Sequence, residues 1–326
     1  MSPIFSAELV NGPFGDPTLY LDFRFESRAL LFDLGDLGAL APRKILRVSD
    51  VFVSHTHMDH FGGFDRLLRL CLGRETEVRL YGPPGFIDRV EHKLAGYTWN
   101  LVQNYAADFA LVAHELAGEQ LRPARFRCHE RFRREPLPQQ PAPQGVLRDE
   151  PGFRVRAAVL DHDVPCLAFA LEEKVHVNVW KNRLLEMGLE VGPWLNELKR
   201  AVAEGASDDT PVRAPGRALP LGELKARVLR LVPGQKLCYV TDVVYGAENA
   251  RRIGALAADA DLLFIECVFL DEDAGQAARK FHLTARQAGL LARAARAKQV
   301  VPFHFSPRYT GREAELRAEL ERGRAG

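Results

Sequence analysis

Short apolar runs alternate with helically spaced apolar positions through the first third of the chain. The runs at 29–34, 51–53 and 78–81 predict buried strands. Between the second and third run, the apolar positions of 61–71 recur near helical spacing and predict an amphipathic helix. A Gly-Pro-Pro-Gly turn at 82–85 precedes another predicted helix. This alternation of strand and helix is typical of α/β proteins.

Side chains that can bind a metal follow several predicted strands. The later apolar runs predict strands at 153–160, 166–172, 237–241, 262–267 and 300–303. Four such side chains stand directly after apolar runs: His55, His162, Asp242 and His304. Loops at strand ends are held by a rigid scaffold, so these groups are expected to meet at one edge of a sheet.

Two segments interrupt this pattern. The first, 121–146, holds six arginines and one acid within 121–134, followed by a proline-rich stretch that does not suit a central strand. Arginine alternates with phenylalanine at 125–127 and again at 131–133, and this pattern fits phosphate contacts and a half-buried strand equally well. The second, 176–235, is less regular and is expected to be an inserted arm. Residues 1–326 are otherwise expected to form a single domain.

The densest chemical signal is His55-x-His57-x-Asp59-His60. Imidazole and carboxylate groups are good zinc ligands, and such a cluster would be costly to bury without a partner. One zinc ion takes about four ligands, so two ions that share a bridge need about seven protein groups and a water. Together with the three later side chains, the chain offers seven. Lone histidines, in contrast, are usually satisfied polar residues, and this is our expectation for His92, His114, His129 and His176.

The seven predicted ligands divide between two ions. His55, His57 and His162 are expected on one ion. Asp59, His60 and His304 are expected on the other, and Asp242 is expected to bridge the two because a carboxylate has two oxygens. These mixed ligands favour Zn²⁺, and they also accommodate Mn²⁺ or Fe²⁺.

The cluster resembles the HxHxDH signature of the metallo-β-lactamase superfamily, and the wider spacing resembles the ribonuclease Z family. Further segments similar to that family's motifs, from about residue 30 to 310, are 32–35, 81–85, 185–193, Glu266, 282–284 and 304–309. The resemblance implies an α/β fold, the four-layer αββα metallo-β-lactamase sandwich. It also implies an endoribonuclease that cleaves precursor tRNA near its 3′ end with a metal-activated water.

The resemblance also assigns roles to side chains outside simple ligation. Asp33 would support the metal ligands from behind. Asp59 would also orient or deprotonate the attacking water, and His282 would protonate or stabilise the leaving oxygen, with Glu266 as its orienting partner. The arm at 176–235 would bind substrate or form a dimer contact, and a homodimer is common in the family.

Composition limits the other functions that the chain could have. With 44 Lys and Arg against 43 Asp and Glu, bulk charge does not favour a protein that coats nucleic acid. Five cysteines without a CxxC pair favour a reducing cytoplasm, and no apolar stretch is long enough to predict a membrane span. Two alternatives to the structured-RNA endonuclease stay open: a hydrolase of a small phosphodiester or ester on the same fold, and a metal-stabilised scaffold with little turnover.

Overall fold

The computed structural model describes residues 4–24, 26–174, 176–232 and 234–326. The chain divides into two compact units. The larger comprises 1–147, 155–170 and 237–326, and the smaller comprises 148–154 and 171–236. Each is described here by itself, and Pro233 of the expected arm lies outside the described residues.

The first sheet of the larger unit has nine strands in the order β1-β2-β3-β4-β5-β6-β7-β8, with β9 also paired to β7. Strands β3 to β6 run parallel, and the other pairs are antiparallel. The strands are β1 (Phe5–Leu9), β2 (Leu19–Phe23), β3 (Ala29–Phe32), β4 (Val48–Phe52), β5 (Glu77–Gly82), β6 (Ala110–Ala117), β7 (Gln120–Arg127), β8 (Arg134–Pro136) and β9 (Gln140–Pro141).

The second sheet has six strands in the order β10-β11-β12-β17-β18-β19. Its last three strands run parallel. The strands are β10 (Val146–Asp149), β11 (Phe153–Asp161), β12 (Pro165–Glu173), β17 (Lys236–Val240), β18 (Leu262–Glu266) and β19 (Gln299–Phe303). The ends of β11, β17 and β19 therefore coincide with the predicted positions of His162, Asp242 and His304.

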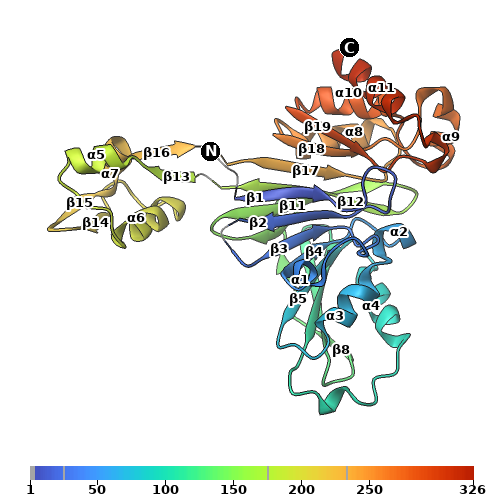
Figure 1. Cartoon of the computed structure of the whole chain (residues 1–326), viewed down its shortest axis with the longest axis horizontal. Coiled ribbons are helices and arrows are strands. Elements are labelled where there is room, and N and C mark those ends of the chain that lie inside the picture. Colours follow the sequence, from blue (N-terminus) through green and yellow to red (C-terminus); the bar gives the residue numbers. More distant parts are fainter. Residues whose placement is uncertain (1–3, 25, 175, 233) are drawn as a thin grey trace. The chain divides into compact units, whose positions relative to one another are not determined.

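Helices cover each sheet on its outer side (Figure 1). Those with the first sheet are α1 (Pro42–Ile45), α2 (Met58–Phe61), α3 (Phe64–Cys71) and α4 (Phe86–Ala95). Those with the second are α8 (Ala247–Ala257), α9 (Ala274–Arg279), α10 (Ala285–Ala294) and α11 (Glu313–Ala325). Aromatic rings join the two sheets: the Phe32 ring lies 5.2 Å from Phe169 and 5.7 Å from Tyr239, centre to centre. The result is the expected order of layers, helix, sheet, sheet, helix.

The amphipathic helix predicted over 61–71 is confirmed over 64–71, but it begins later than expected because Phe61 belongs to a separate short helix. Helix α2 ends at Phe61, and α3 begins at Phe64. Leu34 donates a backbone hydrogen bond to the carbonyl of His60 and accepts one from Gly63. A Cβ atom on Gly63 would meet the carbonyl oxygen of Gly35 at 2.2 Å, so only glycine permits this close approach. The interruption fixes the metal-binding turn against the loop that follows β3.

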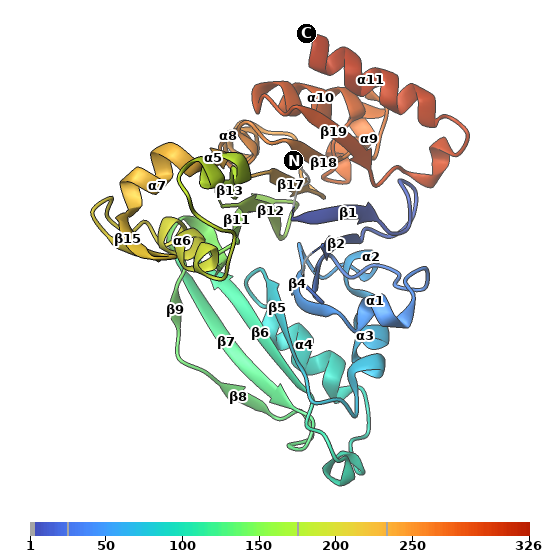
Figure 2. The same cartoon turned by 60° about the vertical axis from the view of Figure 1, so that its left-hand side comes forward.

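The Arg- and Pro-rich segment extends the first sheet at its edge (Figure 2). Phe126 on β7 is buried, whereas Arg127 is exposed and its guanidinium lies 2.6 Å from the Asp108 carboxylate. Arg134 on β8 forms ion pairs with Asp88 and Glu91. The half-buried strand is thus observed at 125–127, whereas the strand alternative is wrong at 131–133, where the chain turns and Arg131 and Phe132 have φ angles of 54° and 55°. The prolines of 136–145 stand in the short strands β8 and β9 and in the loops around them, as expected for a residue that cannot donate a ladder hydrogen bond, whereas Pro123 lies within β7.

The smaller unit is more regular than the sequence indicated. It contains β13 (His176–Val179), α5 (Lys181–Glu186), α6 (Trp194–Ala203), β14 (Pro211–Ala214), β15 (Arg217–Pro220), α7 (Leu221–Val228) and β16 (Leu229–Val232). Strand β13 pairs antiparallel with β16, and β14 with β15. Leu184, Trp194, Leu198 and Leu224 belong to its own buried cluster. In the described part of the chain, no helix has the length and apolar character needed to cross a membrane.

Candidate metal centre

The seven predicted ligands come from four loops of the larger unit. His55 and His57 follow β4, and Asp59 and His60 lie in the short helix α2. His162 lies between β11 and β12, Asp242 follows β17, and His304 follows β19. The seven side chains thus lie in four segments that follow strands, as predicted. These four segments converge on one site.

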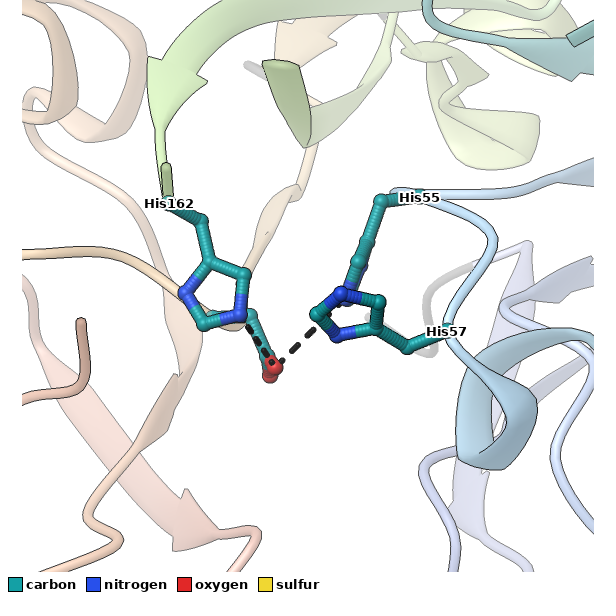
Figure 3. A group of neighbouring side chains, drawn as sticks. His55, His57 and His162 are labelled. Atoms are coloured by element: carbon teal, nitrogen blue, oxygen red, sulfur yellow. Dashed lines mark ion pairs between the residues drawn. The ribbon is translucent and has the colours of Figure 1, made fainter. Parts of the chain in front are cut away.

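The first group of donors surrounds one oxygen of Asp242. One ligand atom each from His55, His57, His162 and Asp242 lies within 4.8 Å of the others. The three imidazole rings turn toward one another (Figure 3). Nε2 of His162 lies 3.3 Å from Oδ2 of Asp242, and Nε2 of His55 lies 3.6 Å from the same oxygen.

The second group surrounds the other oxygen of Asp242. Asp59, His60 and His304 also offer ligand atoms within 4.8 Å of one another. Oδ1 of Asp242 lies 3.3 Å from Nε2 of His60 and 2.9 Å from Nδ1 of His304. Asp242 thus presents one oxygen to each group, in the arrangement that a bridging carboxylate requires.

The chemistry of the donors fits a pair of cations. Nε2 of His55, Nε2 of His60 and Nδ1 of His304 are buried and have no hydrogen-bond partner in the part of the chain that the structure describes. An unsatisfied buried polar atom costs free energy, and three in one cluster call for an explanation. All three point into the two donor groups, where metal coordination would satisfy them.

Asp33 holds the second group in place from behind. Its Oδ2 lies 2.9 Å from Nδ1 of His60 and accepts hydrogen bonds from the hydroxyls of Ser54 and Tyr239. Its Oδ1 accepts a 2.6 Å hydrogen bond from the backbone N–H of Ser54. Because Nδ1 of His60 is engaged, Nε2 is the nitrogen left to face a metal.

The first group has supports of its own. Nδ1 of His162 lies 2.8 Å from the carbonyl oxygen of Phe281, and Nδ1 of His55 lies 3.1 Å from the Ser54 hydroxyl. Sequence reasoning missed Ser54, Tyr239 and Phe281. Ser54 directly precedes the cluster, which is a usable signal. Tyr239 and Phe281 carry none, since one is an ordinary strand residue and the other acts through its backbone.

The structure also brings Glu266 and His282 together beside the centre. Nδ1 of His282 lies 2.9 Å from Oε2 of Glu266, and the other oxygen of Glu266 accepts hydrogen bonds from the backbone of Val243 and Leu283. Glu266 is fully buried, whereas 16% of the His282 side chain is exposed. The imidazole is therefore held from behind while its face reaches solvent. Asp242, Glu266, His282 and His304 form a third group of donor atoms within 4.8 Å.

The electrostatics of the cluster reflect crowding of imidazoles around carboxylates. Burial and the neighbouring His60 lower the pKa of His55 to about 2. Burial opposes the charge on His304 as well, but Asp242 outweighs it and raises the pKa of His304 to about 10. Burial would raise the pKa of Asp242, yet His304 and His60 hold it well below its usual value. Bound cations would displace the protons on this second group, because histidine binds metals unprotonated.

Three residues of the centre have a backbone that L-residues rarely adopt. The φ angles are 60° for Asp33, 25° for Asp242 and 58° for His304. Such conformations persist where the surrounding structure imposes them, and they are frequent at functional sites.

The histidines that were not predicted as ligands lie elsewhere. His114, for example, is buried, stacks on Tyr81 and contacts the carbonyl of Val112.

Comparison with known proteins identifies the family. Residues 203–305 match the beta-lactamase superfamily domain. Ribonuclease Z of Deinococcus radiodurans is 33% identical to this chain, and the match covers 98% of this chain and 95% of that protein. Ribonuclease Z of Methanothermobacter thermautotrophicus is 27% identical, with 90% and 83% covered.

Two solved structures share the fold. The metallo-β-lactamase-fold protein YhfI from Bacillus subtilis superposes with a TM-score of 0.55 at 16% identity, covering 96% of this chain and 90% of that one. The short form of human tRNase Z superposes with a TM-score of 0.50 at 19% identity, covering 94% and 92%. The expected sandwich is confirmed. On the full-length similarity to the Deinococcus enzyme, this chain belongs to the ribonuclease Z family of metal-dependent hydrolases with the metallo-β-lactamase fold.

Proposed function

We propose that the protein is an endoribonuclease that cleaves precursor tRNA near its 3′ end. The observation that carries the proposal is Asp242, whose two oxygens face two separate groups of metal-binding side chains. The ribonuclease Z relatives, which match nearly the whole chain, support the choice of substrate.

The seven ligands would hold two divalent cations as assigned from the sequence, with His55, His57 and His162 on one side of Asp242 and the rest on the other. Mixed imidazole and carboxylate donors favour Zn²⁺, and Mn²⁺ or Fe²⁺ would also fit this set. When bound, such ions lower the pKa of a water and stabilise charge on a phosphoryl oxygen.

The chain's own side chains would complete the reaction. Asp59 is 41% exposed in its side chain, and its Oδ2 lies 3.4 Å from Nε2 of His60 and 3.3 Å from Nε2 of His304. We assign it to orienting the attacking water or taking its proton. His282, held by Glu266, would donate a hydrogen bond or a proton to the leaving oxygen.

The segment 176–235 is proposed to bind RNA away from the cut. Exposed cations of its helices are Lys181, Arg183, Lys199 and Arg200. Such side chains can contact phosphates and position the substrate without reading its sequence. Gly192 and Pro193, which resemble the family's arm element, directly precede α6.

The same segment is also proposed as a homodimer contact. Three of its large apolar side chains are exposed: Trp180 by 42%, Leu185 by 67% and Val191 by 58%. A cytoplasmic location is part of the proposal, and its support is the set of five buried cysteines without a disulfide.

The deciding experiment is a side-by-side assay on precursor tRNA and bis-p-nitrophenyl phosphate. We expect specific 3′ cleavage of the RNA and slower hydrolysis of the small diester, both lost on chelation. Brisk turnover of the diester with no cleavage of any precursor tRNA would favour the alternative, a hydrolase of small phosphodiesters. If the metal-loaded protein turns over neither substrate, the result would favour the remaining alternative, a metal-stabilised scaffold with little turnover.

A further inference from the structure

A hollow of about 380 Å³ adjoins the metal centre on the side of His55 and His57. These two histidines line it together with Thr56, the turn before α4, the start of α4 and the loop after His162. This volume is within the range of roughly 300–1,000 Å³ found for small-ligand sites. All its lining residues belong to the larger unit. Only two of its ten lining residues are predicted metal ligands, so space remains for a part of the substrate that does not react.

The walls of this pocket are mostly apolar. Pro83, Phe86, Val164 and Pro165 line it, and Val164 is 40% exposed. Rigid proline rings and a branched side chain suit contact with the flat face of a base or with a ribose. No carboxylate lines the pocket. An anionic substrate would therefore meet no repulsion from its walls.

Among the described residues that line the pocket, Arg89 is the one lysine or arginine. It is exposed on α4, and the described residues give its guanidinium no ion pair or hydrogen bond. The acids beside it on the helix are engaged elsewhere, since Arg134 lies 2.7 Å from Asp88 and 3.3 Å from Glu91. Arg89 therefore offers an uncompensated positive charge with the fork geometry that suits a phosphate.

The amino end of α4 borders the same pocket. Gly85, with a φ of 87°, precedes the helix, and both Gly85 and Phe86 line the hollow. The dipole of a helix favours negative charge at this end. The amino end of α4 and Arg89 thus make one side of the pocket positive beside the apolar residues, and His55 and His57 would present a bound cation to the same pocket.

We propose that this pocket holds the nucleotide next to the scissile linkage, with its base or ribose against the walls and Arg89 on a neighbouring phosphate. The inference rests on the proposed RNA substrate and deepens it, because it assigns a second phosphate contact about one nucleotide from the reacting one. A small diester has a single phosphate, which belongs at the metal centre, so it would make little use of Arg89.

The test compares Arg89→Gln with a matched control, Arg66→Gln. Arg66 is exposed on α3, outside the pocket, and also has no polar partner in the described structure. We expect Arg89→Gln to lower kcat/KM for precursor tRNA about tenfold more than kcat/KM for bis-p-nitrophenyl phosphate, mainly through KM. Arg89→Lys, which keeps the charge, should recover part of the loss. Arg66→Gln should match the wild type on both substrates.

Two further readouts separate a phosphate contact from a structural effect. The slope of log Kd against log salt concentration for the cleaved RNA products should fall by roughly 0.7–1 in Arg89→Gln and stay unchanged in Arg66→Gln. A neutral methylphosphonate linkage, moved one position at a time away from the cut, should weaken RNA binding by the wild type at the one position that Arg89 contacts, and at that position it should leave RNA binding by Arg89→Gln unchanged.

The outcomes distinguish this inference from the proposed function. If the wild type cleaves precursor tRNA and the two glutamine variants behave alike, the role of Arg89 is wrong while the RNA substrate stands. If the wild type hydrolyses only the small diester, the proposed function fails, and the inference fails with it. If Arg89→Gln loses both activities equally, its effect is on the metal centre and the phosphate contact is overturned.

Discussion

At the scale of single residues, the position of His60 depends on a carboxylate that does not itself face the metals. Asp33 receives three hydrogen bonds from Ser54 and Tyr239 and holds Nδ1 of His60. In Asp33→Asn, one acceptor oxygen becomes an amide that cannot accept these bonds. We expect metal affinity to fall about 10- to 100-fold, measured by competition with a chelator.

The control for this prediction is Asp50→Asn. Asp50 is as buried as Asp33 and lies on β4, the strand that leads to the metal-binding turn, but it pairs with Arg28 at 2.7 Å. Loss of that buried partner should lower the free energy of unfolding and leave metal affinity near the wild-type value. Equal loss of affinity in both variants would mean that Asp33 acts only through stability.

His282 allows a second test at this scale, because its proposed role depends on the leaving group. In His282→Ala, we expect kcat for RNA cleavage to fall about 10²- to 10⁴-fold, the usual size of a general-acid contribution. Bis-p-nitrophenyl phosphate expels a stable phenolate, so its turnover should fall much less. Metal content should be unchanged. Equal losses on both substrates would assign His282 to the metal centre instead of the leaving oxygen.

At the scale of elements, the sequence predicted the parts that depend on local pattern. The strands before His162, Asp242 and His304 were predicted because each is an apolar run that ends at a polar residue. The break at Gly63 was missed because its cause is a long-range contact with Leu34 and Gly35, which no local pattern records.

Order in the smaller unit was missed for a related reason. Its helices and strands have four to ten residues, too few for a clear period. They are stabilised by a small shared core to which Leu184 of α5, Trp194 of α6 and Leu224 of α7 all belong. Which apolar residues of such a region pack together is decided by the tertiary structure, and a single sequence does not reveal it.

The proposed RNA-binding role of this segment can be tested by removing it. The pairing of β13 with β16 and the 2.9 Å hydrogen bond from Glu173 to Gln235 bring the ends of the segment together, so a short glycine linker can replace 176–232. We expect precursor tRNA cleavage to fall at least about 100-fold because remote binding energy is lost. Hydrolysis of the small diester should persist.

The matched variant keeps the fold of the segment and reverses two of its charges. Lys199→Glu combined with Arg200→Glu changes only exposed side chains of α6. It should raise KM for RNA, lower the salt dependence of binding, and leave thermal unfolding close to the wild type. Undiminished RNA cleavage after the deletion would refute the role of the segment.

At the scale of the whole molecule, the metal centre joins the two halves of the sandwich. Its predicted ligands come from loops of both sheets, and three of their buried nitrogen atoms have no hydrogen-bond partner among the described residues. Chelation should therefore remove both activities and lower the thermal midpoint, and Zn²⁺ should restore both. At a free ion concentration of 100 times Kd, the gain in folding free energy is about 2.7 kcal/mol per site.

Metal analysis should find two ions per chain. In Asp242→Ala, we expect the loss of more than one ion, because each oxygen of Asp242 faces its own group of donors. Well under two ions in protein never exposed to chelator, or an Asp242→Ala protein that retains both, would contradict the bridged pair on which the proposed chemistry depends.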